Sequence, residues 1–178
     1  LYFADPSNFR VRLITPSNPS MMYAFAGNGT FDFSGDGLPS VQAQLAYPYG
    51  VWLNSNGEAY IADYANNRIR KVTSGTSIIS TFIGHTSGSY NGDGLTIANT
   101  NLNGPIDVCG DTSGLIYVVE YDGCRIRKID PINNLVTVMV GTGTCTSSGT
   151  ATVLAGSASI DNSRGLWINT LGILFFAE

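Results

Sequence analysis

The sequence contains few charged side chains and very few basic ones. Of its 178 residues, 12% are charged, only one is His, and nine basic side chains are outnumbered by thirteen acidic ones. Proteins that bind nucleic acid without sequence preference gain most of their affinity from Lys and Arg side chains that neutralise phosphates. The charge balance therefore argues against nucleic acid as a partner.

Long apolar segments are also absent from the sequence. No run approaches the roughly 18 consecutive apolar residues that a membrane helix requires, so we expect no insertion into a membrane. The chain is nevertheless 43% apolar, and intrinsically disordered segments have far fewer apolar groups and many more charges. A folded core is therefore expected.

Helical periodicity is missing, because no window shows a sustained apolar period of about 3.6 residues. The apolar runs are short and end at turn sequences such as Asn56-Gly57 and Ser113-Gly114. The 21 Gly supply turn conformations, and nine Tyr and eight Phe suit pleated, half-buried surfaces. The composition predicts an all-β fold.

The sequence repeats itself with a period of 57 or 58 residues. Three segments align without a gap: LYFADPSNFRVRLI (1–14), AYIADYANNRIRKV (59–72) and IYVVEYDGCRIRKI (116–129). Each contains an acid–arginine motif, in which an acidic residue is followed by two arginines one residue apart. The motif residues are Asp5, Arg10 and Arg12, then Asp63, Arg68 and Arg70, then Glu120, Arg125 and Arg127. A fourth copy begins at LFFAE (174–178).

One period contains four segments of strand length, which in the middle unit are residues 50–54, 58–63, 68–72 and 78–84. Their short connections force antiparallel neighbours, because a parallel pair needs a crossover of a dozen or more residues. A four-stranded antiparallel meander that recurs at such intervals is typical of a β-propeller blade. We predict units at 1–49 (partial), 50–104, 105–164 and 165–178 (partial), with inner strands at 50–54, 105–109 and 165–169 and almost no helix.

Residues 48–72 resemble the NHL repeat, with Pro48 and Gly50 ahead of the sequence YIADYANNRIRKV. The resemblance covers the whole chain in three units. Propellers of this family usually have six blades, which implies that the chain forms half of a ring or a piece of a longer array. Because a closed ring would not duplicate a second strand, we expect a fragment whose partners include other blades, of the same or a neighbouring chain.

The acid–arginine motif allows two interpretations. Arginines at i and i+2 point to one face of a strand, and a guanidinium group matches a carboxylate or loop carbonyls well. The motif is therefore suited to tying one blade to the next. The alternative is a basic stripe for RNA, but eight of the nine basic residues lie in this strand motif and only Arg164 lies elsewhere.

Metal binding and catalysis find little support. The loops SGDG (34–37) and NGDG (91–94) could offer calcium ligands through Asp32 and Asp36, or through Asn91 and Asp93. Gly-Asp-Gly is also an ordinary turn, and two acids per loop fall short of a calcium loop. His85 is the only histidine, and neither a hydrolytic triad nor a His-rich zinc site can be assembled. We predict no metal, no cofactor and no catalytic residue.

The cysteines predict one disulfide and one free thiol. Cys124 opens the third strand of its unit, Cys145 follows the fourth, and neither position is Cys in the other units. The turn at 131–134 folds these two strands into a hairpin, so we predict a Cys124–Cys145 disulfide. Cys109 stands where the other units have Trp52 and Trp167, and we expect all three to pack between blades.

The resulting functional prediction is a non-catalytic interaction or structural module of a larger extracellular repeat protein. A disulfide implies an oxidising compartment, and the sequon Asn28-Gly29-Thr30 predicts glycosylation at Asn28. The module would contact other proteins or assemble with copies of itself. Two alternatives stay open: a propeller enzyme whose catalytic or metal-binding residues lie outside this chain, and an RNA-binding NHL domain.

Overall fold

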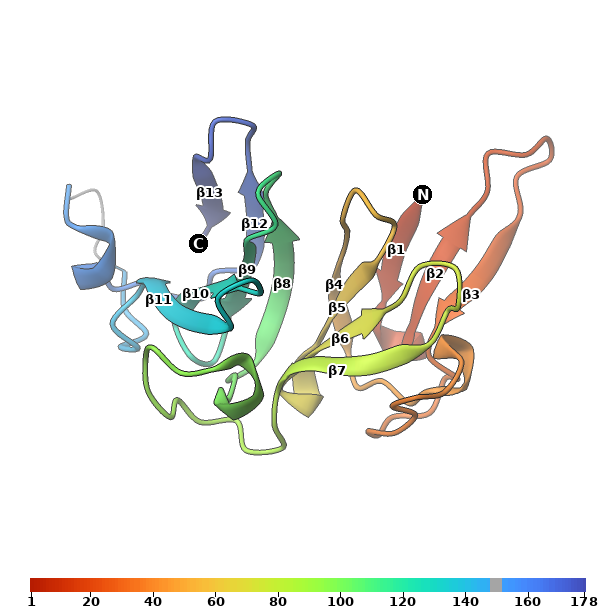
Figure 1. Cartoon of the computed structure of the whole chain (residues 1–178), viewed down its shortest axis with the longest axis horizontal. Helices are drawn as coiled ribbons and strands as arrows, with labels where there is room; N and C mark the ends of the chain where they lie inside the picture. Colours follow the sequence, from red (N-terminus) through yellow and green to blue (C-terminus); the bar gives the residue numbers. More distant parts are fainter. Residues whose placement is uncertain (148–151) are drawn as a thin grey trace.

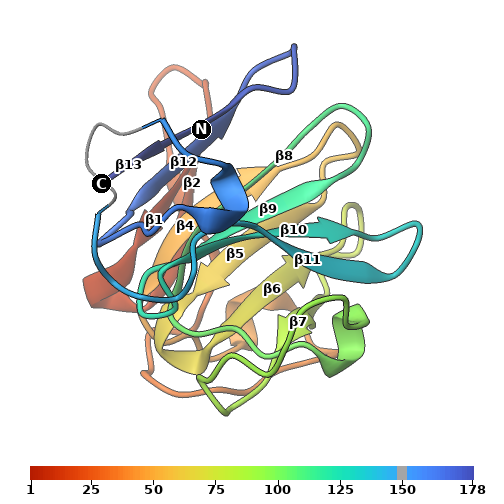
Figure 2. The ribbon, with the colours of Figure 1, turned by 90° about the vertical axis from the view of Figure 1, so that its left-hand side faces the viewer.

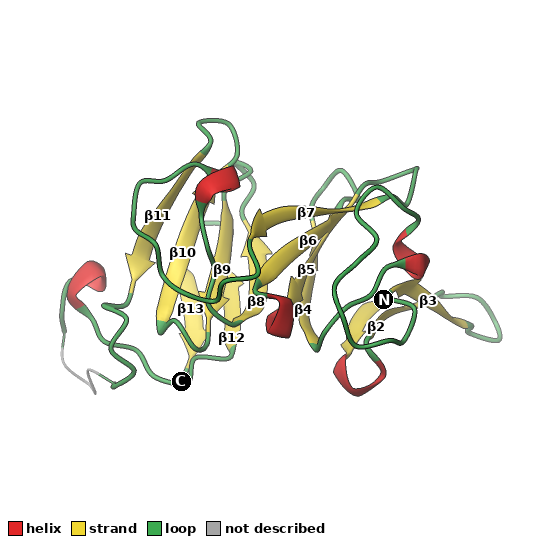
Figure 3. Cartoon of the chain, turned by 90° about the horizontal axis from the view of Figure 1, so that it is seen from below, coloured by secondary structure: helices red, strands yellow, loops and turns green. Residues whose placement is uncertain are grey.

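The computed structural model of the chain describes residues 1–147 and 152–178. These residues form four antiparallel sheets joined by loops and short 3-10 helices, and this part of the chain contains no α-helix. Figures 1 and 3 show the sheets as separate blades that follow one another along the molecule. The all-β fold with four-stranded antiparallel blades is thus confirmed.

The sheets contain three, four, four and two strands in chain order. The first contains β1 (Tyr2–Asp5), β2 (Arg10–Ile14) and β3 (Met22–Ala26). The second contains β4 (Pro48–Leu53), β5 (Ala59–Asp63), β6 (Arg68–Val72) and β7 (Ile79–Gly84). The third contains β8 (Pro105–Gly110), β9 (Ile116–Glu120), β10 (Arg125–Asp130) and β11 (Leu135–Val140), and the fourth contains β12 (Gly165–Ile168) and β13 (Leu174–Ala177).

Short 3-10 helices lie in the connections. Helix η1 (Pro6–Asn8) lies between β1 and β2, and η3 (Tyr64–Asn66) lies between the equivalent strands β5 and β6. The links that run from one sheet to the next contain η2 (Ser40–Gln42), η4 (Ile97–Asn99) and η5 (Ala155–Ser157). Successive inner strands are in contact, β4 with β8 and β8 with β12, and Figure 2 shows β9, β10 and β11 following β8 outward in the third sheet.

The same irregularity recurs in the outer part of the first three sheets. The outermost strands are β3, β7 and β11, and they pair with β2, β6 and β10. The register of this pairing shifts between Val11 and Arg12, between Ile69 and Arg70, and between Ile126 and Arg127. Each shift leaves one extra residue on the outer strand, as a β-bulge does. These residues are Phe25, Phe82 and Met139, and each packs against one of the core clusters.

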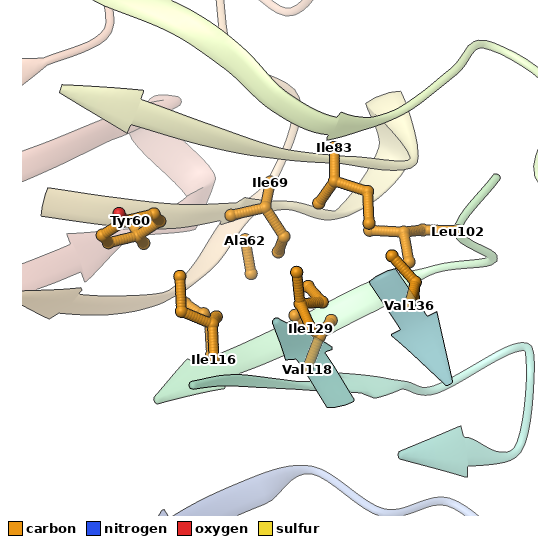
Figure 4. Packing of buried hydrophobic residues seen from close by; sticks show 10 residues of the cluster. Tyr60, Ala62, Ile69, Ile83, Leu102, Ile116, Val118, Ile129 and Val136 are labelled. Carbon is orange, nitrogen blue, oxygen red and sulfur yellow. The ribbon is translucent and has the colours of Figure 1, made fainter. Parts of the chain in front are cut away.

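The core lies between the sheets. Strand β5 is buried at every residue, because Ala59 and Ile61 face the first sheet while Tyr60 and Ala62 face the third. Figure 4 shows the second of these contacts, where Tyr60, Ala62 and Ile69 meet Ile116, Val118 and Ile129. Strand β5 needs apolar residues on both faces because the second sheet packs against the first sheet on one side and the third sheet on the other.

Trp167 does not follow the expectation for the inner-strand tryptophans. Trp52 is half-buried, packs against core clusters on both sides of the third sheet and lies over Gly110. Trp167 is 60% exposed and contacts Phe175 at a ring distance of 5.3 Å. The prediction that Trp167 packs between blades is wrong for the described chain, because its sheet is covered on one face only.

Candidate interaction surface

The acidic residues of the second and third motifs, and Glu178 of the fourth copy, fix the end of the link that enters their sheets. Asp63 accepts a hydrogen bond from the backbone N–H of Ala46 at 2.7 Å, and Glu120 accepts one from Asn103 at 2.8 Å. Glu178 accepts the equivalent bond from Asp161 at 3.2 Å. Burial raises the pKa of the Asp63 and Glu120 carboxyl groups, although these hydrogen bonds and the neighbouring arginines oppose the rise.

The second arginine of the middle motif holds the same link at three further points. The Arg70 side chain is fully buried, and its guanidinium group lies 3.3 Å from the Asp63 carboxylate and 2.7 Å from that of Asp36. It also donates to the carbonyls of Ser34 and Gln44. A buried guanidinium group needs several acceptors because its desolvation is costly. Within the described residues, Nε is the one nitrogen of the Arg70 side chain that has no hydrogen-bond acceptor.

The second arginines of the other two motifs, Arg127 and Arg12, have fewer partners than Arg70. Arg127 is buried and donates to the Gly92 carbonyl, but its nearest distance to the Glu120 carboxylate is 3.6 Å. Within the described residues, Nε and Nη1 of Arg127 have no hydrogen-bond acceptor. Arg12 contacts Asp5 at 2.9 Å, and both side chains are 22% exposed.

The first arginine of each motif holds the link that leaves its sheet. Arg10 donates to the Asn28 carbonyl, Arg68 to the Thr86 hydroxyl and Arg125 to the Thr142 carbonyl. An aromatic ring from the entering link lies over two of these guanidinium groups, Phe33 over Arg68 at 3.8 Å and Tyr90 over Arg125 at 3.9 Å. The arginines are therefore occupied by the fold's own loops, which leaves few of them for an external anion.

The Gly-Asp-Gly turns cover the outer edges of the sheets they enter. Gly37 donates to Ile79 of β7, and Gly94 donates to Val136 of β11. Asp36 binds Arg70, whereas Asp93 accepts from the Val138 N–H at 2.6 Å.

The remaining candidate ligands have local partners as well. Asp32 accepts from the N–H of Phe33, Asn91 bridges Asn99 and Asn101, and His85 contacts the Ala98 carbonyl at 2.8 Å. No group of three or more His, Cys, Asp or Glu that could hold a metal occurs in the part of the chain that the structure describes.

Cys124 and Cys145 are joined by a disulfide with a Cα–Cα distance of 5.2 Å, and Cys109 is free and buried. The bond ties the turn after β9 to the link that leaves β11. Part of that link, residues 148–151, lies outside the described residues.

The equivalent contact in each of the first three units is made differently. In the second unit Asn67 contacts Gly88 and accepts from the Gly104 N–H at 2.9 Å. In the first unit the rings of Phe9 and Phe31 meet edge to face at 5.4 Å. The alignment places Phe9 with Asn67 and Cys124, and Phe31 with Gly88 and Cys145. We call this contact the turn–link lock.

The predicted glycosylation residue lies on the same link. Asn28 is exposed, its side-chain oxygen accepts from the Thr30 N–H at 2.8 Å, and its amide donates to the Gln42 carbonyl at 3.3 Å. The acceptor amide is thus at the surface and held only by one long hydrogen bond.

Five aromatic rings form a continuous row across the face that carries the turn–link locks. Consecutive contacts join Phe31 to Tyr47, Tyr47 to Tyr49 and Tyr49 to Tyr64, at 5.4, 6.3 and 5.4 Å between ring centroids. Phe9 contacts both Phe31 and Tyr47. Phe31, Tyr47 and Tyr49 are 51%, 39% and 44% exposed. We call these five residues the aromatic row.

Two residues of the row adopt a backbone conformation that disfavours aromatic side chains. Phe9 has φ 51° and Tyr47 has φ 53°. The equivalent positions have Asn67 and Cys124 for Phe9, and Gly104 and Asn162 for Tyr47. Asn and Gly tolerate left-handed geometry, whereas Cys124 adopts it at φ 47° as the two aromatic residues do. The conformation costs about 1–2 kcal/mol for other residues, and strain of this kind is concentrated at functional sites.

A hollow of about 410 Å³ adjoins the end of the aromatic row. It is lined by Tyr49 and Tyr64 from the row and by Gly50, Ile106, Asp107, Tyr121 and Arg164. Both carboxylate oxygens of Asp107 accept backbone hydrogen bonds, from Val108 and Leu166, and burial raises the pKa of this carboxyl group. Burial and a hydrogen bond to the neighbouring Asp122 raise the pKa of Tyr64 to about 12.

A second hollow, of about 450 Å³, lies at the opposite ends of the inner strands. Its polar residues belong to three equivalent turns, in which the side chains of Asn54, Asp111 and Asn169 accept hydrogen bonds from backbone N–H groups within their own turns. These side chains serve the turns, so the aromatic row and its hollow are the stronger candidate surface.

Comparisons with known proteins agree with this architecture. NHL repeat-containing protein 2 of Bos taurus is 26% identical over 144 residues, covering 78% of the chain and 20% of the relative. Teneurin-1 of Caenorhabditis elegans is 25% identical over 189 residues, covering 96% of the chain and 7% of the relative. SUPPRESSOR OF QUENCHING 1, a chloroplastic protein of Arabidopsis thaliana, is 28% identical over 162 residues, covering 86% and 15%. The chain thus spans a fifth or less of each of these relatives.

Solved structures show the same fold. A protein of unknown function from Bacteroides thetaiotaomicron superposes with a TM-score of 0.76 at 18% identity, over 99% of the chain and 41% of that protein. A chain of a nidogen/laminin complex superposes with a TM-score of 0.61 at 14% identity, over 98% of this chain and 51% of that one. Virginiamycin B lyase from Staphylococcus aureus superposes with a TM-score of 0.56 at 13% identity, over 99% of this chain and 44% of the lyase.

No protein-family model matches the sequence. The fold nevertheless defines the class as a β-propeller. Within that class the chain has NHL-like repeats, which confirms the resemblance seen in the sequence.

The aromatic row was not among the predicted sites. Its residues Phe9, Phe31 and Tyr47 lie at positions where the first unit departs from the second, not at positions that the repeats share. The detectable signal was an aromatic residue at turn positions that have Asn or Gly in another unit.

Proposed function

We propose that the chain is a non-catalytic interaction module of a larger extracellular repeat protein, and that it mediates protein–protein contact or self-assembly. The observation that carries this proposal is the exposed aromatic row beside a hollow. Large aromatic side chains are enriched at protein interfaces and dominate their energetics. The curated relatives are much longer than this chain, in agreement with a module within a larger assembly of blades.

Two features support an oxidising, extracellular location. The Cys124–Cys145 disulfide suits such a compartment, and Asn28 is an exposed residue that opens a glycosylation sequon. Among similar proteins, Teneurin-1 is similar in sequence and a chain of the nidogen/laminin complex shares the fold. We include no nucleic acid among the partners because the arginines hold the links.

The interaction test is a selection of displayed peptides on the immobilised chain, with a Tyr49→Ser variant for counter-selection. Tyr49 is 44% exposed, so its replacement should leave the fold intact. We expect peptides that bind the original chain and are lost on the variant. If selection enriches nothing, and sedimentation shows no self-association at any concentration, the interaction function is wrong.

The location test is expression through a secretory pathway. We expect a glycosidase-sensitive product whose shift disappears in an Asn28→Gln variant, together with a Cys124–Cys145 bond in non-reducing peptide maps. An unglycosylated product with both thiols free would contradict the extracellular assignment while leaving the interaction function standing.

A further inference from the structure

We propose that the aromatic row binds an extended proline-rich peptide in the polyproline II conformation, with Lys or Arg beside its prolines. This inference rests on the proposed interaction function and names the chemistry of the partner. It concerns Phe9, Phe31, Tyr47, Tyr49 and Tyr64 together with the hollow that adjoins Tyr49 and Tyr64.

The fold does not require exposed rings at these positions. The second unit forms its turn–link lock with Asn67, Gly88 and Gly104 at the positions of Phe9, Phe31 and Tyr47, and the third forms it with a disulfide. Phe9 and Phe31 still make the lock contact in the first unit. That contact explains why two rings touch each other, but not why Phe31, Tyr47 and Tyr49 are widely exposed.

The inclination of the rings favours a ridged ligand over a flat one. Phe31 and Tyr47 are inclined at 65°, and Tyr49 and Tyr64 at 76°, while Tyr47 and Tyr49 are inclined at only 17°. The row is therefore an uneven surface, and the hollow lined by Tyr49 and Tyr64 opens at its end. Proline-rich segments bind to aromatic-lined surfaces because the polyproline II helix is preformed. It advances about 3.1 Å per residue, so neighbouring rings in the row are separated by about two residues of such a peptide.

Hydrogen bonding suits the same ligand. A polyproline II backbone has no internal hydrogen bonds, and its carbonyls need donors when it is bound. Tyr47 and Tyr49 provide hydroxyl groups along the row, whereas the Tyr64 hydroxyl already bonds to the Asp122 carboxylate.

The charges around the row favour a basic peptide. Asp32 follows Phe31 in the chain and is exposed, and Asp122 lies beside Tyr64. The basic groups here have partners in the fold: Arg10 donates to two carbonyls, and Arg164, which also lines the hollow, donates to the Tyr121 hydroxyl. The same charges disfavour RNA, whose bases would also need flat stacking platforms.

The test is a titration of the chain with a fluorescent synthetic peptide of about ten residues that contains two Pro-x-x-Pro units and flanking arginines. A matched peptide has Ala in place of each Pro. We expect saturable binding of the first peptide and at least about tenfold weaker binding of the second, because the unfolded Ala peptide must be ordered. A neutral oligosaccharide and a uridine oligonucleotide complete the ligand set.

The variants Tyr47→Gly and Tyr49→Ser should each weaken peptide binding at least about tenfold. Phe175→Ser is the matched control, since Phe175 is 49% exposed on β13 and outside the row, and it should bind as the original chain does. Circular dichroism establishes that each variant is folded.

Equal affinity for the Pro and Ala peptides, or preferential binding of the sugar or RNA, would overturn this inference. So would unchanged binding by both folded row variants. If displayed peptides without proline bind at the row, the interaction function stands and this inference falls. If no peptide binds at all and the chain does not self-associate, both fall.

Discussion

Arg70 and Arg12 hold equivalent positions but lie in different environments. Arg70 is fully buried and contacts two carboxylates and two carbonyls. Arg12 makes one ion pair with Asp5, in which both side chains are 22% exposed. Breaking a buried ion pair leaves an uncompensated charge and costs about 3–5 kcal/mol, whereas an exposed pair contributes about 1 kcal/mol or less.

The first prediction concerns these two arginines. Arg70→Met should lower the free energy of unfolding by about 3–5 kcal/mol because Asp63 remains buried without its partner. Arg12→Met, the matched control, should lower it by less than about 1 kcal/mol. Urea denaturation followed by fluorescence measures both. Equal effects of the two substitutions would show that Arg70 does not anchor the link in solution.

The Cys109 thiol provides a prediction with pH dependence. Burial, with smaller effects of Asp107 and Asp111, raises its pKa to about 12. A raised pKa lowers the thiolate fraction at any pH below that value, and the thiolate is the reactive form. Iodoacetamide should therefore leave Cys109 unmodified in the native protein from neutral pH to about pH 9 and modify it in denaturant. Rapid native modification, detected by mass spectrometry, would contradict the buried placement.

At the scale of elements, the strands and their order could be predicted because the period is short and the turn residues recur. The inner strand expected at 105–109 occupies Pro105–Gly110, and the third strand at 68–72 occupies Arg68–Val72. The links were harder to predict because their structure depends on contacts with other elements. Gly-Asp-Gly is recognisable as a turn, but its pairing with β7 or β11 is a tertiary event.

The candidate site was less predictable than the fold. The cysteine pair could be inferred because both residues appear in one unit and the hairpin brings them together. The contacts of the aromatic row could not be inferred in this way. Phe31, Tyr47 and Tyr64 are far apart in sequence, and they meet only when a link folds over the turns. Trp167 shows the same limit, because its position in the repeat predicts its strand but not whether another blade covers it.

At the scale of the whole molecule, stacking of blades determines what a given position contributes. Trp52→Ala should lower the free energy of unfolding by about 3–5 kcal/mol, because its ring packs between the second and third sheets. Trp167→Ala should change it by less than about 1 kcal/mol, because that ring is 60% exposed. Thermal unfolding of the chain compares them. A large effect at Trp167 would mean that an assembly covers this face in solution.

The aromatic row can be separated from its structural role by moving the lock of the third unit into the first. Phe9 and Phe31 align with Cys124 and Cys145, so a double variant, Phe9→Cys with Phe31→Cys, should form a disulfide at the same contact. Closing a loop of this size contributes roughly 3 kcal/mol in chain-entropy terms, which offsets the lost ring contact. The variant keeps the lock and removes two rings of the row.

The most direct test of the account is therefore the affinity of the proline-rich peptide for the oxidised double variant. We predict that this variant forms the bond, unfolds cooperatively and binds the peptide at least about tenfold more weakly than the original chain. A folded, disulfide-bonded variant that binds the peptide as tightly as the original chain would contradict the claim that the row is a binding surface.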